Sequence, residues 1–468
     1  MSKKTKIVAT IGPSSQTLPQ MKELLSAGVN VFRFNMKHND VSWHEERIAR
    51  ADEAASSLGL SAGILIDLQG PEIRIETKNK AEIEVEKGET VIFGRDFESE
   101  KIQVAIPHPE VFELLKTGDS LLIDDGFLEF EIVRKIRGTF EAIARDHYTI
   151  KNRKGLNLPG KNIELPSLIA SDLLKLDMAT RSKVDFVALS FCRSKKDIEI
   201  LRAELTKRNL EVGIVAKIES QEALDNLDEI VGEADAVMVA RGDLGIEVPI
   251  EQLASWQKMM IAKCRKAKKP VIVATQMLQS MTENPRPTRA EATDVSNAVW
   301  DGTDAVMLSG ETASGIYPLQ AAEAMARIAK FNEGAAIVKE LFEEAEDNTQ
   351  AVAAAAYRMV HEQHKLEIKA IVVFTETGYT ARAISAFRPN VPILAVTDSS
   401  KTADRMAMSF GVTSFITTFP EGNFSMTAEV VKKLIASKLV SRGDTVVAVH
   451  GQHFNKPNLT NALELVRL

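Results

Sequence analysis

The sequence predicts an α/β protein with a (β/α)₈ TIM barrel, a small β-barrel lid domain inserted into that barrel, and a C-terminal α/β domain. Three observations predict this architecture. Eight short apolar runs rich in β-branched residues alternate with helix-period segments in the first two-thirds of the chain. More than a hundred residues separate the third run from the fourth, far more than a strand-to-helix connection needs. A further set of strand and helix patterns follows about residue 330.

The eight runs are the predicted barrel strands, at residues 6–10, 29–34, 64–67, 186–189, 214–218, 236–239, 271–275 and 305–308. Helix-period segments lie between them, for example at 18–27 and 252–266. Strands that alternate with helices pair in parallel, and eight such units fit a closed barrel. An open doubly wound sheet fits the same pattern.

The long insertion has the texture of a small antiparallel β domain. Alternating runs at 82–86 and 128–133 are punctuated by Gly88, Gly118 and Gly126. A domain inserted over the C-terminal face of a barrel commonly acts as a lid. We expect the barrel at 1–70 and 160–332 and the lid at 71–159. A C-terminal α/β regulatory domain is expected at 333–468, with strands at 371–375, 393–396 and 445–449 and helices at 380–386 and 427–439.

Composition excludes several classes of protein. The chain has 468 residues, 44% of them hydrophobic, and carries 58 Lys and Arg against 65 Asp and Glu, a net charge of −7. That balance argues against binding to nucleic acid, which requires a basic face. The 2 cysteines cannot form a disulfide framework, and no apolar run has the length of a signal peptide or a membrane span. A cytoplasmic protein is expected.

Polar residues follow nearly every predicted barrel strand, at the end where barrel enzymes gather their active residues. These strand ends are Thr10-Ile11-Gly12-Pro13, Arg33-Phe34-Asn35, Asp67, Ser190-Phe191-Cys192-Arg193, Lys217-Ile218-Glu219, Arg241-Gly242-Asp243, Thr275-Gln276 and Ser309-Gly310-Glu311. Packing does not explain this concentration.

Lys217 and Glu219 form the most informative pair. Side chains two residues apart on a strand share a face, and a buried lysine costs several kcal/mol unless it is paired or functional. An interior ion pair is one interpretation. The other gives Glu219 to a divalent metal, together with Asp243 after the next strand, and Lys217 to a developing negative charge. Two carboxylates with water and substrate oxygens suit Mg²⁺, whereas a turn-forming Asp243 without metal is the alternative.

Other candidates are cations and a hydroxyl. Arg33, Arg74 and Lys154 are candidate phosphate clamps, although a surface cation is more often only solvated. Gly242 permits a ligand to approach the backbone closely. Thr275 places a hydroxyl at a strand mouth, where a helix cap is the alternative role.

These segments, in this order, closely resemble the pyruvate kinase family. The matching pieces are ATIGPSS, FRFN, IDLQGPEIR, GLNLPG, ALSF, AKIES, MVARGDLGIE, ATQMLQSM, PRPTRAEATDVSNAVWDGTDAVMLSGETA and FTETGYTARAISAFRPNVPILAVT. The resemblance implies phosphoryl transfer from phosphoenolpyruvate to ADP, which gives pyruvate and ATP in glycolysis. It also implies Mg²⁺ (or Mn²⁺) as the cofactor and a homotetramer.

The resemblance also implies roles for individual residues. Glu219 and Asp243 hold Mg²⁺, and Lys217 stabilises the enolate-like transition state. Phosphoenolpyruvate is held by Arg33, Lys217, Gly242, Asp243 and Thr275, and Thr275 is the candidate route for the proton that reaches the enolate. The nucleotide side is formed by Asn35, His38, Arg74 and Lys154.

The sequence departs from the family pattern at the K⁺ site. The family binds K⁺ with Asn35, Asp67, a serine and a threonine; here Lys37 stands at the serine position and Leu68 at the threonine position. Members that need no K⁺ resemble this chain at Leu68-Gln69 but usually carry a lysine where Glu72 stands. Our hypothesis is that the Lys37 ammonium replaces K⁺. The alternative is a solvent-directed lysine with K⁺ binding retained.

A second site is expected in the C-terminal domain. Thr375, Thr377, Gly378 and Thr380 lie between a predicted strand and a helix, where backbone N–H groups can hold a phosphate. In the family this segment resembles a sugar-phosphate effector pocket, and a helix cap is the alternative. The companion loop at 450–457 is unlike the glycine-rich loop of fructose-bisphosphate-activated members, so the effector stays unidentified.

Two other functions fit parts of the pattern. A metal-dependent aldolase acting on pyruvate would share the two carboxylates, but it would not need the inserted domain, Arg74 or Lys154. A regulatory protein with a decayed site would not need to keep Lys217 and Glu219.

Overall fold

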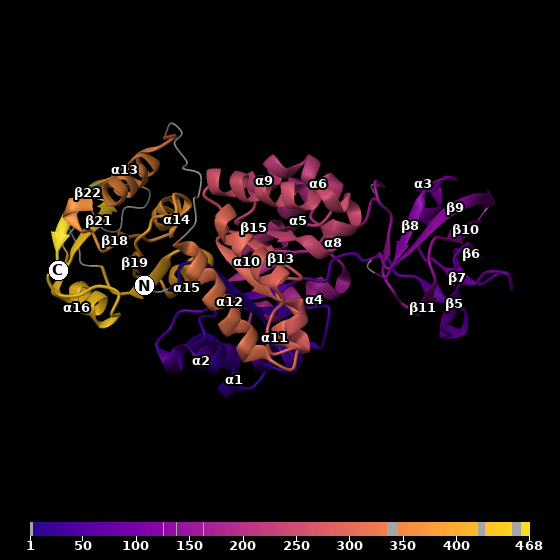
Figure 1. Cartoon of the computed structure of the whole chain (residues 1–468), viewed down its shortest axis with the longest axis horizontal. Coiled ribbons are helices and arrows are strands. Elements are labelled where there is room, and N and C mark those ends of the chain that lie inside the picture. The colour runs from indigo at the N-terminus through magenta and orange to yellow at the C-terminus, as the bar shows by residue number, and fades with distance from the viewer. Residues whose placement is uncertain are drawn as a thin grey trace.

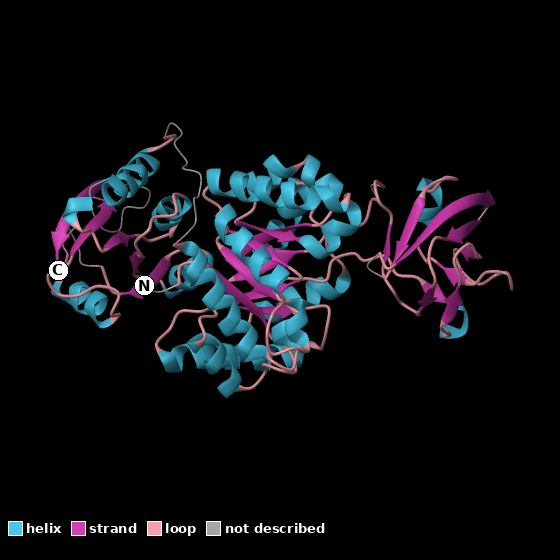
Figure 2. Cartoon of the chain, in the orientation of Figure 1, coloured by secondary structure: helices cyan, strands magenta, loops and turns pink. Residues whose placement is uncertain are grey.

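The computed structural model describes residues 3–124, 126–136, 138–161, 163–334, 345–362, 364–419, 426–451 and 460–468. The molecule is elongated, with a central barrel, the inserted β part at one end and the C-terminal α/β part at the other (Figure 1). Helices surround the strands of the barrel, whereas the inserted part consists mainly of strands (Figure 2). No helix in the described ranges is both long and apolar enough to cross a membrane.

Eight strands close into a parallel barrel, in the order β1-β2-β3-β13-β14-β15-β16-β17 and back to β1. They are β1 Lys6–Thr10, β2 Val31–Asn35, β3 Gly63–Asp67, β13 Phe186–Leu189, β14 Gly213–Ile218, β15 Ala236–Ala240, β16 Val271–Ala274 and β17 Ala305–Leu308. The closed barrel is confirmed and the open doubly wound sheet is excluded. Each predicted strand lies within two residues of an observed one.

The barrel helices are α1 Leu18–Ser26, α2 Val41–Leu58, α4 Ala170–Ala179, α5 Lys195–Lys207, α6 Gln221–Asp225, α7 Leu227–Glu233, α8 Arg241–Glu247, α9 Leu253–Lys266, α10 Arg289–Asp301, α11 Gly310–Ala313 and α12 Pro318–Glu333, with short 3₁₀ turns at Ile250–Gln252 and Gln279–Thr282. Local signals set several of their ends. α10 begins at a capping box in which the Thr288 hydroxyl accepts from Glu291 N and the Glu291 carboxylate accepts from Thr288 N. It ends at Gly302, whose φ of 86° favours glycine.

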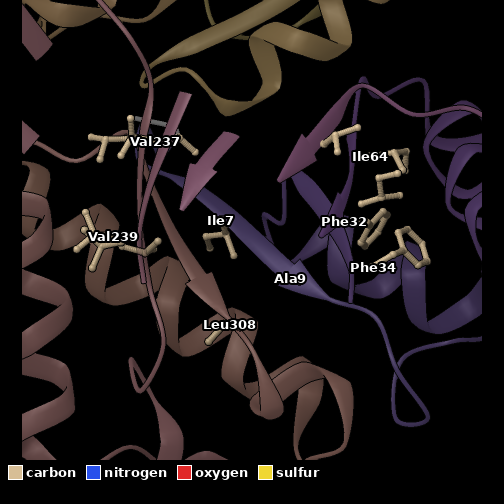
Figure 3. Packing of buried hydrophobic residues seen from close by; sticks show 14 of the residues in the cluster. Ile7, Ala9, Phe32, Phe34, Ile64, Val237, Val239 and Leu308 are labelled. Atoms are coloured by element: carbon tan, nitrogen blue, oxygen red, sulfur yellow. The ribbon is translucent and has the colours of Figure 1, made fainter. Parts of the chain in front are cut away.

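Alternation along the strands divides the barrel core into two sets. Ile7, Phe32, Ile64 and Val237 belong to the large cluster that also contains the residues of the surrounding helices (Figure 3). A second cluster, in the barrel interior, contains the residues one position away along the strands: Val8, Val31, Leu65, Ala188, Val215, Ala236, Met238 and Ile272 among them. Because the side-chain period is two, the residues two positions beyond this inner set also face inward, at the carboxyl end of the barrel.

The inserted part has a core of its own. A sheet of seven strands in the order β12-β8-β9-β10-β6-β7-β4 lies beside a β11-β5 pair. The elements are β4 Glu76–Thr77, β5 Ile83–Val85, β6 Thr90–Gly94, β7 Val104–Ala105, β8 Ser120–Ile123, β9 Leu128–Ile136, β10 Thr139–Ala144, β11 Tyr148–Ile150 and β12 Leu156–Asn157, with a 3₁₀ turn at Lys78–Lys80 and helix α3 Pro109–Leu114. Phe93, Phe130 and Phe140 pack in its centre. The pairing is antiparallel as predicted, except that β6 and β7 run parallel.

The C-terminal part is a five-stranded sheet in the order β20-β19-β18-β21-β22. Its elements are α13 Asn348–Glu362, β18 Ala370–Phe374, α14 Tyr379–Ala386, β19 Ile393–Thr397, α15 Ser400–Arg405, β20 Val412–Ile416, α16 Ala428–Ala436, β21 Thr445–Gly451 and β22 Thr460–Arg467, with 3₁₀ turns at His364–Leu366 and Met406–Met408. The sequence-based prediction missed β20, β22 and α15. The antiparallel edge strand β22 has only one fully buried residue, Thr460, so its pattern carries little hydrophobic signal.

Candidate active site

Strand alternation brings a set of charged side chains together at the carboxyl end of the barrel. Arg33, Asp67 and Lys217 each lie two residues beyond an interior apolar residue of their strand. Arg33 donates from Nε to Asp67 Oδ2 at 2.7 Å, and its Nη1 donates to Thr10 Oγ1 at 2.9 Å. Burial alone would raise the pKa of Asp67, but Lys217 and Arg33 together lower it. Asp67 is therefore a fixed anion that positions two cations.

Lys217 lies at the centre of this set. Its Nζ is 2.8 Å from Glu219 Oε1 and 3.4 Å from Asp67 Oδ1, and it donates to Ser190 Oγ at 2.7 Å. Burial acts to lower the pKa of Lys217, but the carboxylates of Asp67 and Glu219 outweigh it and raise this pKa. The ammonium stays charged. The interior Lys217–Glu219 ion pair, one of the two interpretations of the sequence, is thus present. Because the pair lies at the carboxyl end of the barrel, it is also compatible with a role in catalysis.

Glu219 also faces a cavity that Asp243 shares. The cavity has a volume of about 130 Å³ and extends between the barrel mouth and the base of the inserted part, with Gly155, Phe191 and Asp243 also lining it. Glu219 is only 2% exposed, and its Oε2 accepts from Phe191 N at 2.7 Å. Burial, assisted by Asp243, raises the pKa of Glu219 to about 7 although Lys217 opposes the shift.

These carboxylates fit a divalent cation. Glu219 Oε1 is close to Lys217 but has no well-directed hydrogen bond among the described residues. No group of three or more His, Cys, Asp or Glu suited to a metal occurs in the described part of the chain. An ion here would be held by two carboxylates and would take its other ligands from water and substrate, as Mg²⁺ and Mn²⁺ do.

Thr275 lies in a strained turn at the mouth of β16. Its φ is 68° and that of Gln276 is 53°, in the left-handed region that β-branched residues rarely adopt. Gly242 N donates to Thr275 Oγ1 at 2.7 Å. Gly242 is the second residue of α8, so the Thr275 hydroxyl caps the first turn of that helix. The capped helix follows β15, the neighbouring strand, and not β16, the strand that Thr275 itself follows. A Cβ at Gly242 would lie 3.5 Å from that hydroxyl, so no protein contact requires glycine there.

Arg241 holds this turn, a role that was not predicted from the sequence. Its guanidinium donates to Ala274 O at 3.2 Å and Thr275 O at 2.7 Å, and pairs with Asp294 at 2.7 Å. Ser190, which links Lys217 to the Leu68 carbonyl, was also missed. Arg241 and Ser190 are each a polar residue at the end of a strand, which was the available signal in the sequence. Their roles could not be predicted because their hydrogen-bond partners come from other strands.

One of the predicted nucleotide residues, Arg74, lines a second cavity of about 390 Å³, together with Lys37, Gln69, Glu72, His108 and Arg153 among others. Arg74 Nη2 and Lys37 Nζ lie 2.7 and 3.0 Å from Glu72 Oε2. Burial, followed by Lys37, Arg33 and Arg74, lowers the pKa of His38. Lys154 lies apart from this set: its Nζ is 2.8 Å from Asp124 Oδ1.

The residues of the predicted monovalent-cation region are occupied by protein contacts. Asn35 Oδ1 accepts from Lys37 N at 3.2 Å. The Asp67 carboxylate binds Arg33 and Lys217. Leu68 is buried, and its carbonyl accepts from Ser190 Oγ at 2.7 Å. Lys37 is directed to Glu72, with 37% of its side chain exposed.

The predicted effector segment forms a compact turn before α14. Gly378, with a φ of 79°, donates to Thr375 Oγ1 at 2.9 Å, and Tyr379 N lies 3.4 Å from Thr377 Oγ1. Thr380 Oγ1 is 2.7 Å from Thr460 Oγ1. No side chain of the described residues caps α14 at Gly378. Of the companion loop at 450–457, residues 452–457 lie outside the described residues, so an effector role remains a prediction.

Comparison with known proteins agrees with this geometry. The family model for the pyruvate kinase barrel domain matches residues 2–322, and the model for the pyruvate kinase alpha/beta domain matches residues 350–466. Pyruvate kinases of Sporosarcina psychrophila and Geobacillus stearothermophilus are each 38% identical, over 99% of this chain and 80% of theirs. The crystal structure of a pyruvate kinase from Cryptosporidium parvum is 33% identical and superimposes with a TM-score of 0.91, over 99% of this chain and 96% of that one. The chain belongs to the pyruvate kinase family.

Proposed function

We propose that the protein transfers a phosphoryl group between phosphoenolpyruvate and ADP in glycolysis, with Mg²⁺ held by Glu219 and Asp243. The observation that carries the proposal is the position of Lys217. Its charged Nζ is held by Glu219 and Ser190 at the barrel mouth, and Glu219 lines the same cavity as Asp243. Phosphoryl transfer requires mainly positioning and charge neutralisation, which this arrangement can supply.

Each cation then has a place in the reaction. Arg33 and Lys217 supply fixed positive charge where the phosphoryl group leaves the enol oxygen, so Lys217 stabilises the charge that develops there. Glu219 and Asp243 would hold a Mg²⁺ ion, and the ion would supply further charge neutralisation for the transferring phosphoryl group. Asp243 and Gly242, at the start of α8, lie beside Thr275 and complete the substrate site. The Thr275 hydroxyl, through water, is the proposed route for the proton that converts enolate to pyruvate.

The nucleotide is proposed to lie on the side of Asn35, His38, Arg74 and Lys154. Arg74 pairs through its backbone with Gly155, next to Lys154, so both cations belong to the base of the inserted part. A rotation of that part over the barrel would carry them together toward a bound nucleotide. A kinase requires a nucleotide, whereas the alternative metal-dependent aldolase does not, so dependence on ADP distinguishes the two functions.

A coupled assay of pyruvate formation tests the function. Pyruvate should appear only when phosphoenolpyruvate, ADP and Mg²⁺ (or Mn²⁺) are all present, and Glu219→Gln should raise the Mg²⁺ concentration required. Arg74→Ala should raise the KM for ADP and leave the KM for phosphoenolpyruvate nearly unchanged. Pyruvate formation without ADP would instead support a lyase or aldolase.

We further propose that K⁺ is not required because Lys37 supplies the positive charge. The support is that two of the family's K⁺ ligands are already engaged by protein groups: Asn35 Oδ1 accepts from Lys37 N, and the Asp67 carboxylate binds Arg33 and Lys217. Activity in tetramethylammonium chloride should equal that in KCl at the same ionic strength. Lys37→Ser, which restores the family's residue, should acquire activation by K⁺, with Lys78→Ser as a control in the inserted part. A severalfold activation of the unchanged protein by K⁺ would reject the proposal.

Assembly, location and regulation are further proposals. The apolar side chains of Trp300 on α10 and Phe331 on α12, the latter 80% exposed, line one groove and support self-association, with a homotetramer as the family's habit. Light scattering of the intact protein and of Phe331→Glu would test it. A cytoplasmic location and a sugar-phosphate effector at Thr375, Thr377, Gly378 and Thr380 stay predictions.

A further inference from the structure

A cationic cavity lies where the barrel meets the C-terminal part, away from the proposed catalytic site. One wall is the end of α9 and the turn that leads into β16, and the other includes α14, which Figure 1 shows on the side of its domain that faces the barrel. The lining residues are Arg265, Lys268, Lys269, Pro270, Asp304, Arg382, Ser385, Ala386, Arg388 and Ser409. Five of them are cations and one is an anion.

Several cations of this cavity have partners among the described residues: Lys268 Nζ lies 3.8 Å from Glu346 Oε2, and Lys269 Nζ donates to Ala234 O at 2.6 Å. Arg388 pairs with Asp304 at 2.7 Å, and this pair joins the two domains. Arg265 donates to the carbonyl of Ala386 across the interface, and burial, with a contribution from Arg388, lowers the pKa of Arg265 to about 9. Arg382 makes one long hydrogen bond, 3.3 Å to Thr377 O, among the described contacts. An anion in the cavity would relieve the repulsion between Arg265 and Arg388.

The Ser409 hydroxyl is a second and independent sign of a ligand. Ser409 is 1% exposed and is one of the residues that line the cavity, and its Oγ has no hydrogen-bond partner among the described residues. A buried hydroxyl without a partner costs free energy. Its backbone N–H donates to Met406 O at 2.9 Å, so the residue is fixed in place. A hydroxyl donor beside guanidinium groups is a common arrangement for an oxyanion.

The geometry points to an anion-binding site for inorganic phosphate, or for the phosphate group of a metabolite, at this interface. The cavity has a volume of about 10 Å³, about the room that a single water molecule needs. Phosphate therefore enters when the long side chains of Lys268 and Arg382 swing toward the opening. Arg382 and Lys268 then clamp the anion while Ser409 donates its hydroxyl.

The position of the site gives it a regulatory consequence. Arg382 lies on α14, directly after the turn of the predicted effector segment. On the other wall, Lys268 and Lys269 precede β16, the strand that ends at Thr275. An anion held between them braces the domain of the effector segment against the strand that carries a proposed substrate residue. The binding site itself does not depend on the proposed reaction.

Phosphate binding to the full-length protein tests the inference. We expect saturable binding of inorganic phosphate by calorimetry at constant ionic strength, in the absence of substrates. Arg382→Gln should weaken it by at least about tenfold, since a charged, bidentate donor is lost. Ser409→Ala should weaken it about threefold or more, with no loss of thermal stability in phosphate-free buffer because the deleted hydroxyl has no partner.

Two controls distinguish this site from other sources of binding. Lys263→Gln removes an equivalent charge from the exposed face of α9 and should leave binding unchanged. Thr375→Val alters the effector turn, lies outside the cavity and should also leave phosphate binding unchanged. An absence of saturable binding would overturn the inference, as would equal losses in Lys263→Gln and Arg382→Gln. A glucose 6-phosphate arm that fails with Thr375→Val but survives Ser409→Ala would assign the sugar phosphate to the effector turn.

Discussion

Replacing Lys217 by methionine should destabilise the barrel as well as abolish activity. The substitution keeps most of the side-chain volume but removes the ammonium that lies 2.8 Å from Glu219 Oε1 and 3.4 Å from Asp67 Oδ1. Asp67 keeps its two contacts with Arg33, whereas the one described hydrogen bond that buried Glu219 keeps comes from the N–H of Phe191. Breaking a buried ion pair from one side costs about 3–5 kcal/mol. We expect a value near the lower end, about 3 kcal/mol, because Asp67 remains paired.

The assay uses the placement of the tryptophans. All 3 of them lie in barrel helices, Trp43 in α2, Trp256 in α9 and Trp300 in α10, so tryptophan fluorescence in urea reports on the barrel. Unfolding should be followed without divalent metal, because an ion bound to Glu219 would replace the lost charge. The matched variant is Lys217→Met with Glu219→Gln, which removes the orphaned carboxylate and should recover at least about 1 kcal/mol.

Two results would refute this reasoning. The first is a loss of stability below about 1 kcal/mol in the single variant, with no recovery in the double variant, because the buried pair would then not be coupled. The second is a kcat within tenfold of the unchanged protein. A loss of about 10³-fold corresponds to ~4 kcal/mol of transition-state stabilisation, which is what a buried ammonium at a developing charge should supply.

Three further predictions concern other parts of the chain. Arg241→Gln should release the strained Thr275 turn and lower kcat by about 10-fold or more, with a smaller change in the KM for ADP; equal changes in both constants would contradict a positioning role. Burial and the nearby Asp404 carboxylate raise the pKa of Asp185 from 3.8 to about 7, so the folded state binds the extra proton and stability should fall as pH rises from about 4 to about 7. Asp185→Asn should remove this pH dependence, which amounts to up to ~4 kcal/mol in the free energy of unfolding over the interval. Urea midpoints that change equally between pH 5 and pH 8 in the variant and the unchanged protein would exclude the effect. Both cysteines are buried with raised pKa values, so a thiol reagent should label neither until the barrel unfolds; rapid labelling at pH 8 would show an opening near one of them.

Much of this molecule can be inferred from local patterns. Continuous apolar runs placed every barrel strand, because the side chains that face the interior and those that face the helices must both be apolar. The two-residue period of a strand predicted that Lys217 and Glu219 share a face, and Lys217 Nζ does lie 2.8 Å from Glu219 Oε1. The polar strand ends and their family resemblance identified most residues of the candidate site. These features depend on residues that are close in sequence.

Contacts between distant segments required the folded chain. Whether eight strands close or stay open depends on the pairing of β1 with β17, nearly 300 residues apart, which no local pattern encodes. Likewise, Lys154 pairs with Asp124 within the inserted part, and Lys37 pairs with Glu72, because charge alone does not choose among many possible partners. The same holds for Ser409, a residue with no local signal: only the folded chain shows that its hydroxyl is buried with no partner among the residues that the structure describes.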